Sequence, residues 1–244
     1  MLKKKLYELF NVLYRQVLDG AAFRDRHKTT LRAHFDEFSQ VNRDITLCPI
    51  CGIHPLKKRQ DLSRDQYDHY LPKTKYPLSA INFQNLVPGC SDCNGLEVKG
   101  DKDVIEESGG VLFYPFDDAH EELTVCFGIE KDHPDIDEIG WTVNYSSDAG
   151  KKQEIEAWRK IYNIDGRHIG FIAPRIAKWF KHRMQVHDAT IRQGGDENTF
   201  EITYTQCLHF DQEHHLNFLR KPSLDCFIQE SVLARATEEA KFYR

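Results

Sequence analysis

Two pairs of cysteines constrain the fold of this chain more than any other feature of its sequence. Each pair has the spacing C-x-x-C, with Cys48 and Cys51 in the first pair and Cys90 and Cys93 in the second. Paired units of this kind are typical of zinc sites, and four thiolates complete a tetrahedral shell with no open position for catalysis. We therefore predict a structural Zn²⁺ ion that ties together two segments separated by 38 residues. A redox role would need a βαβ pattern beside one pair, and neither pair has one.

The length and hydropathy of the chain favour a cytoplasmic protein with no membrane partner. Its 244 residues can bury a hydrophobic core without disulfides. No apolar run approaches the roughly 20 residues that span a bilayer, and polar residues interrupt the N-terminal segment where a signal peptide needs an apolar run. In a reducing compartment, C-x-x-C pairs bind metal more often than they form disulfides. We interpret the three remaining cysteines as ordinary buried thiols: Cys126, Cys207 and Cys226.

The segment between and just after the cysteine pairs holds most of the chemically active groups. A strand is predicted at residues 67–71 and a second at residues 85–87, because both are rich in residues that favour extended backbone. A turn at Gly89 then leads into a short helix that Gly100 would end. Four polar residues of this segment are candidates for a reaction: Asp68, His69, Asn85 and Asn94.

The order of these residues resembles that of HNH endonucleases with a ββα-metal core, in the branch that carries zinc knuckles. The resemblance covers about residues 46–100 and rests on the Asp-His dipeptide, the Asn-Leu-Val-Pro run and the Cys-Asn pair in their order among the paired cysteines. It implies metal-dependent hydrolysis of DNA phosphodiester bonds, with His69 as the general base. It also implies that Asp68 and Asn94 bind Mg²⁺ or Mn²⁺ and that Asn85 fixes the loop that orients His69.

The chemistry of the residues supports these roles separately from the resemblance. Phosphodiester hydrolysis needs a nucleophilic water, neutralisation of the charge that builds on the phosphoryl oxygens, and a stabilised leaving group. A histidine with an ordinary pKa of about 6.5 is mostly neutral at cytoplasmic pH, so His69 could accept a proton from water. A carboxylate and an amide oxygen are hard ligands that suit Mg²⁺ or Mn²⁺.

Each of these residues also has a simpler interpretation. Neighbours on a regular strand point to opposite faces, so Asp68 and His69 can meet at one metal only if the strand ends or twists there. Taken alone, the Asp-His pair is typical of a surface hydrogen bond, Asn85 of a turn and Asn94 of a helix start. The family's lysine three residues after the Cys-Asn pair is Glu97 here, which leaves the phosphate contacts open. The candidate phosphate-binding lysines near the site are Lys73, Lys75 and Lys99.

The net charge of −5 combines regions of opposite sign. Residues 101–149 carry fourteen acidic and two basic side chains, so their net charge is −12 and the rest of the chain carries +7. A phosphate backbone would repel a segment of this negative charge. We therefore expect the segment to face away from DNA, to cover an inhibitory position, to meet a basic partner or simply to be solvated. Residues 1–34 hold eight basic against three acidic side chains, which either contact DNA or form a solvated face.

The flanking segments are predicted to be mainly helical. Apolar spacing predicts helices at residues 6–17, 31–38 and 155–162, and prolines predict two further helices beginning at Pro174 and Pro222. Short strands are predicted at residues 123–127 and 141–145. In the helix after Pro174, three basic residues share a face that could follow phosphates without reading bases: Arg175, Lys178 and His182.

The expected fold class is α+β, with a small ββα-metal core and four-cysteine zinc site at residues 46–100. An N-terminal helical arm at 1–45, an acidic segment with short strands at 101–149 and a basic, mainly helical region at 150–244 complete the chain. The expected partner is DNA. Similarity in size and layout to HNH effectors of bacterial defence systems such as Septu implies a separate ATPase or regulatory subunit, since the sequence has no P-loop. Double-strand cleavage would need a homodimer or sequential nicks.

Two interpretations from other classes stay open. The first is a zinc-stabilised DNA- or protein-binding subunit without catalysis. The second is a structural subunit whose acidic segment, residues 101–149, docks a partner.

Overall fold

The computed structural model describes residues 2–18, 20–41, 47–57, 65–111, 113–114, 123–147, 150–211, 216–231 and 234. The chain forms two compact units. Unit 1 comprises Met1–His120 and Lys152–Ile164, and unit 2 comprises Glu121–Lys151 and Asp165–Arg244. The contacts therefore divide the chain differently from its composition, since the acidic segment 101–149 contributes to both units.

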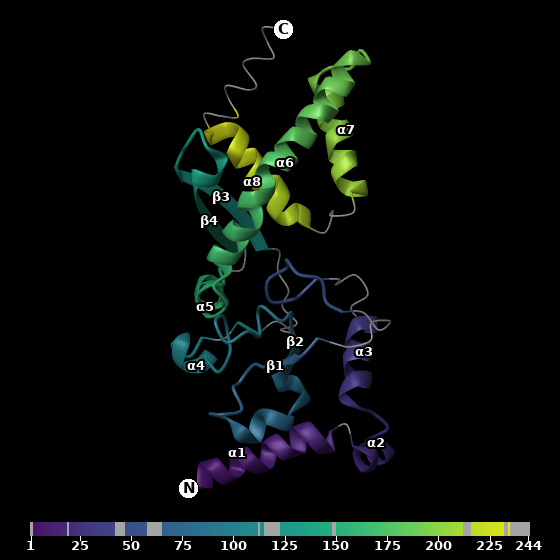
Figure 1. Cartoon of the computed structure of the whole chain (residues 1–244), viewed down its shortest axis with the longest axis vertical. Helices are drawn as coiled ribbons and strands as arrows, with labels where there is room; N and C mark the ends of the chain where they lie inside the picture. The colour runs from purple at the N-terminus through teal and green to yellow at the C-terminus, as the bar shows by residue number, and fades with distance from the viewer. Residues whose placement is uncertain are drawn as a thin grey trace. The chain divides into compact units, whose positions relative to one another are not determined.

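Unit 1 combines helices with one short antiparallel strand pair (Figure 1). Its regular elements are α1 (Leu2–Val12) followed by a π-helical turn (Leu13–Val17), α2 (Ala21–His27), α3 (Leu31–Val41), β1 (Tyr67–His69), two 3-10 turns (Pro77–Ile81 and Phe83–Asn85), β2 (Leu86–Pro88), α4 (Val104–Glu107) and α5 (Lys152–Tyr162). In the strand pair, Asp68 lies opposite Val87 and His69 opposite Leu86. The two strands predicted around the candidate residues are confirmed, although each has only three residues.

The helix predicted between Gly89 and Gly100 is wrong. Residues 91–101 form successive turns, and the next helix, α4, has only four residues. Two glycines explain the difference. Gly95 weakens a helix because it has no side chain to restrict its backbone, and Gly100 has a φ of +46°, in the left-handed region that stops a helix. The structure thus shows a strand pair beside the cysteines without the helix of a ββα core.

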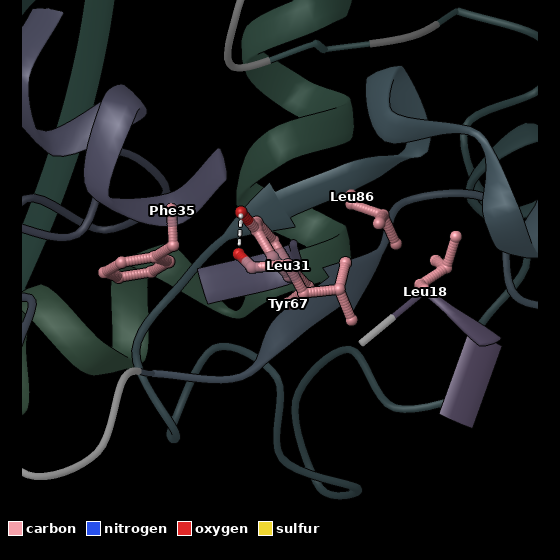
Figure 2. Close-up of a cluster of buried hydrophobic side chains, with 5 residues drawn as sticks. All are labelled: Leu18, Leu31, Phe35, Tyr67 and Leu86. Carbon is pink, nitrogen blue, oxygen red and sulfur yellow. Dashed lines mark hydrogen bonds between the residues drawn. The ribbon is translucent and has the colours of Figure 1, made fainter. Parts of the chain in front are cut away.

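The N-terminal helical arm packs on the strand pair. Figure 2 shows Leu18 and Leu31 from the N-terminal segment beside Tyr67 of β1 and Leu86 of β2, with Phe35 of α3 in the same cluster. All five side chains are buried. The Tyr67 hydroxyl donates a hydrogen bond to the Leu31 carbonyl at 3.5 Å, which fixes α3 against β1.

In its described residues, unit 2 combines an antiparallel strand pair with helices (Figure 1). Its elements are β3 (Leu123–Lys131), β4 (Gly140–Ser147), α6 (Ile164–Arg192), α7 (Glu197–Phe210) and α8 (Asn217–Glu230). The two predicted strands are confirmed as an antiparallel pair in which Ile129 lies opposite Trp141. Helix α8 packs on this pair, since Trp141 stacks on Phe227 with 6.3 Å between ring centroids. Among the described residues, no helix is both long and apolar enough to cross a membrane.

Three predictions for unit 2 are corrected by the structure. Pro174 lies inside α6 and Pro222 inside α8, so neither begins its helix. Pro174 has no N–H to donate to the carbonyl four residues before it, that of Gly170, so α6 continues past the proline without this hydrogen bond. Cys126 is exposed and Cys207 half-buried, so of the three isolated cysteines only Cys226 is a buried thiol.

Candidate metal centre and active site

The four paired cysteines form a cluster in unit 1 that could hold a metal ion. All four side chains are buried, and their sulfur atoms lie within 4.8 Å of one another. The Sγ atoms of Cys48 and Cys93 are 3.7 Å apart, and those of Cys51 and Cys90 are 3.9 Å apart. A tetrahedron with Zn–S bonds of about 2.3 Å has edges of about 3.8 Å. The donor set and its spacing therefore fit Zn²⁺, as the sequence predicts.

Backbone and side-chain contacts position the thiols. The Cys90 backbone N–H donates to Cys48 Sγ at 3.3 Å, and the Ile53 N–H donates to Cys51 Sγ at 3.5 Å. Such N–H···S bonds are typical of sites that stabilise thiolates. From α5, the Trp158 indole donates to the Ile50 carbonyl at 2.7 Å. The first cysteine pair is thus fixed by a helix that follows it by about a hundred residues.

His69 is arranged as a neutral base. Its Nε2 lies 3.2 Å from the Ala80 carbonyl, which can only accept, so Nε2 carries the proton and Nδ1 keeps its lone pair. The Tyr14 ring packs edge-on against the imidazole, with 4.5 Å between centroids. Burial, together with the positive charge of Lys73, lowers the pKa of His69 from its ordinary 6.5 to about 4. The imidazole is therefore uncharged at neutral pH.

Asn85 fixes the loop that supports His69, as the resemblance implies. Its Oδ1 accepts from the Leu71 N–H at 2.7 Å, and its Nδ2 donates to the carbonyls of Leu71 and Ser79, each at 3.1 Å. These three bonds close the loop between β1 and β2. Because Ser79 precedes Ala80, they also fix the carbonyl that holds the His69 ring.

Asp68 and Asn94 are not brought together on a common cation. The Asp68 side chain is 2% exposed, with Oδ1 3.0 Å from Lys99 Nζ and Oδ2 3.5 Å from the Tyr162 hydroxyl. Asn94 is half-buried, and its Nδ2 donates to the Tyr67 carbonyl at 3.5 Å. Burial raises the pKa of Asp68 although the charge of Lys99 acts in the opposite direction. In this arrangement the two residues do not fit a shared Mg²⁺ or Mn²⁺ ion.

The physical reason is the alternation of side chains along β1. Asp68 and His69 point to opposite faces of the strand, so Asp68 faces the buried side. There Lys99, fully buried, also donates to the carbonyls of His69 at 2.9 Å and Gly100 at 3.3 Å. Its three protons are thus used by three oxygens. Lys99 cannot contact DNA as predicted, because its ammonium lies inside unit 1.

The other lysines predicted to bind DNA have different surroundings. Lys73 lies beside the site, 3.3 Å from Asn11 Oδ1 and 5.5 Å from the centre of the Tyr14 ring. Burial and the nearby charge of Arg15 lower the pKa of Lys73. The N-terminal segment therefore contributes Asn11 and Tyr14 to the site, whereas the sequence predicted for it a helical arm whose basic side chains contact DNA or solvent. The excess of basic residues in that arm was the available signal.

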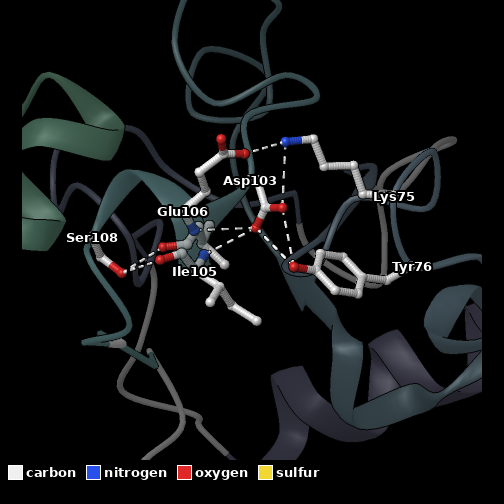
Figure 3. A network of polar contacts seen from close by, with 7 residues as sticks. Lys75, Tyr76, Asp103, Ile105, Glu106 and Ser108 are labelled. Atoms are coloured by element: carbon white, nitrogen blue, oxygen red, sulfur yellow. Dashed lines mark hydrogen bonds and ion pairs between the residues drawn. The ribbon is translucent and has the colours of Figure 1, made fainter.

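Lys75, by contrast, is used in an ion-pair network (Figure 3). Its Nζ lies 3.4 Å from Asp103 and 2.5 Å from Glu106. Asp103 caps the N-terminus of α4 and accepts from the Tyr76 hydroxyl at 3.0 Å. The network tethers the loop after His69 to α4. The carboxylates of Asp103 and Glu106 neutralise the charge of Lys75, which was predicted to bind DNA.

The basic face predicted on α6 is also divided. Arg175 folds back on Phe171, 3.9 Å from the ring centre, and donates to the Phe171 carbonyl at 2.9 Å. Lys178 and His182 instead line a pocket within unit 2, described below.

Within the described residues, the four cysteines are the only group of three or more His, Cys, Asp or Glu side chains placed to hold a metal ion. Comparisons of the chain with protein-family models, curated proteins and solved structures gave no match.

Proposed function

We propose that the chain is an endonuclease of the HNH type that hydrolyses DNA phosphodiester bonds, with His69 as the general base. The observation that carries this proposal is the state of His69. The imidazole is neutral, anchored through Nε2 and backed by a loop that Asn85 fixes, so Nδ1 remains available to accept a proton. Within the part of the chain that the structure describes, Nδ1 has no hydrogen-bond partner.

The proposed step is a direct hydrolysis. Nδ1 of His69 takes a proton from water while the water oxygen attacks phosphorus, and the P–O bond to the leaving sugar oxygen breaks. Lys73 places a positive charge beside the base. This charge stabilises the negative charge that grows on the phosphoryl oxygens in the transition state. The leaving oxygen takes a proton from solvent. In this proposal His69 accepts the proton from water and Lys73 supplies the positive charge beside it.

The two predicted metals have different parts in this proposal. Zn²⁺ fits the four cysteines and would supply structure, since no coordination position is left for substrate. Mg²⁺ or Mn²⁺ does not fit Asp68 and Asn94 as they are arranged, because Lys99 occupies the Asp68 carboxylate. We therefore derive no step through a second cation.

Replacement of His69 by alanine is expected to reduce cleavage of supercoiled plasmid by about 10²–10⁴-fold, the usual contribution of a general base. The assay uses purified protein with Mg²⁺ or Mn²⁺, and with EDTA in a parallel series. His54→Ala is the matched control, because His54 is half-buried, lies outside the candidate active site, and has its side chain 3.0 Å from Asp92. Cleavage that survives in His69→Ala would assign the base to another residue.

The pH dependence of cleavage should reflect the lowered pKa of His69. A general base works in its neutral form, so kcat/KM, which reports the free enzyme, should rise with pH through about 4 and then stay level. An ordinary histidine would place this rise near 6.5. A pH–rate profile between 3.5 and 8 (about one point per half unit) measures the midpoint. A midpoint above 6 would contradict the buried, neutral imidazole.

One observation favours the alternative function, a zinc-stabilised DNA- or protein-binding subunit without catalysis. The carboxylate predicted to bind the catalytic metal is already paired with Lys99. DNA binding without cleavage by wild-type protein under any of the metal conditions would support this alternative. A role as a cytoplasmic effector in bacterial defence, a separate ATPase or regulatory subunit, and a homodimer that cuts both strands stay predictions from the resemblance.

A further inference from the structure

Unit 2 contains a pocket that the proposed nuclease reaction does not use. It has a volume of about 420 Å³ and lies between α6 and the start of α8, with Asp211 at its edge. The residues that carry the argument are Lys178, Trp179, Lys181, His182, Asp211 and Arg220. This volume falls within the range of about 300–1,000 Å³ that is typical of small-molecule sites.

The most informative residue of the pocket is Arg220. Its side chain is 2% exposed, yet the guanidinium carries a full charge. One nitrogen donates to Asp211 at 2.7 Å and another to His182 Nδ1 at 3.1 Å. The third nitrogen, Nε, makes no hydrogen bond within the described residues. A buried guanidinium with an unused donor is costly in a protein interior, so its position needs an explanation beyond packing.

The charges around Arg220 are not balanced. Lys178 and Lys181 line the pocket and are exposed, and among the described lining residues the only carboxylate is that of Asp211. His182 accepts from Arg220 through Nδ1, so its proton lies on Nε2, which is then a further donor. In the described part of the pocket, Lys178, Lys181 and Arg220 against Asp211 leave an excess of two positive charges. A dianion matches that excess.

We propose that this pocket binds a small phosphorylated organic molecule. Arginine and lysine together are the usual ligands of a phosphate dianion, with the guanidinium giving directed hydrogen bonds and the ammonium groups point charges. The volume exceeds what a bare phosphate would fill and leaves space for an organic group beside Trp179, a buried residue that lines the pocket.

The same features argue against a duplex as the occupant. A DNA backbone contacts exposed cations along a surface, whereas Arg220 is a buried residue that lines a pocket. The face predicted to follow phosphates also lacks Arg175, which is turned onto Phe171. The site is therefore independent of the proposed nuclease activity.

Titration calorimetry on the full chain tests this proposal. The probes are adenosine monophosphate, pyrophosphate and inorganic phosphate, with adenosine and succinate to separate the phosphate from the organic group and from charge alone. We expect adenosine monophosphate to bind more tightly than phosphate, and adenosine and succinate not to bind. The double variant Lys178→Gln/Lys181→Gln should weaken binding by at least about tenfold, since charge-assisted hydrogen bonds are lost.

The controls separate a lost site from a damaged fold. Both lysines are exposed, so the double variant should keep the wild-type circular dichroism spectrum. Lys221→Gln removes an exposed lysine next to Arg220 in sequence that does not line the pocket, and it should bind the probes like wild type. The proposal is overturned if no phosphorylated probe binds or if succinate binds equally well. It is also overturned if the double variant binds the phosphorylated probes like wild type and loses affinity only for DNA.

Discussion

Replacement of Cys90 by serine is expected to unfold unit 1. A structural zinc site contributes roughly 10–16 kcal/mol of apparent binding free energy, which is as large as the whole stability of a typical domain at about 5–15 kcal/mol. Among the described residues, the four sulfurs are the only group of His, Cys, Asp or Glu side chains that could hold a metal, and they join two segments that are 38 residues apart in the sequence. Loss of one thiolate should therefore remove both the metal and the fold around it.

Hydrogen exchange measured on peptides from β1 and β2 would detect this loss, together with the zinc content of the purified protein. Cys126→Ser is the matched control, because Cys126 is exposed on β3 and lies outside the cluster. It should retain one zinc per chain and wild-type exchange. Wild-type protein without zinc, or a Cys90→Ser variant as protected as Cys126→Ser, would refute the zinc assignment.

The zinc cluster could be predicted because its signal is local. Two residues between the cysteines of a pair suffice to bring both thiols to one ion, whatever the rest of the chain does. The strands β1 and β2 were also predictable from extended-favouring residues near Tyr67 and Val87. The role of Asn85 as a loop-fixing residue came from the resemblance, and its three hydrogen bonds agree with it.

The surroundings of Asp68 could not be predicted from spacing. Which of two adjacent strand residues faces the interior depends on what packs against each face, and here Lys99 and Tyr162 come from distant parts of the chain. The same limit applies to Tyr14, which reaches His69 across 55 residues. The prediction of a helix start at Pro174 was wrong because the preference of proline for the first turn was overridden by the long helix α6 around it.

Replacement of Lys99 by methionine is expected to destabilise unit 1 by about 3–5 kcal/mol, the usual cost of leaving one partner of a buried ion pair uncompensated. Among the described residues, the Asp68 carboxylate, 2% exposed, would keep only the Tyr162 hydroxyl at 3.5 Å as a partner. The carbonyls of His69 and Gly100 would lose a donor as well. Urea titrations of wild type and variant, each followed by hydrogen exchange of β1, would measure the difference in the free energy of unfolding.

A surface ion pair gives the matched comparison. Lys160 and Glu107 lie 3.2 Å apart with side chains 63% and 42% exposed, so Lys160→Met should cost no more than about 1 kcal/mol. The double variant Asp68→Asn/Lys99→Met removes both buried charges and should recover most of the stability that Lys99→Met loses.

Equal effects of Lys99→Met and Lys160→Met would mean that the Asp68 carboxylate is free of Lys99 in solution. In that case Mn²⁺ should raise the melting temperature of wild-type protein through Asp68. With the ion pair intact, Lys99 already occupies the position of the cation and Mn²⁺ should leave that temperature unchanged.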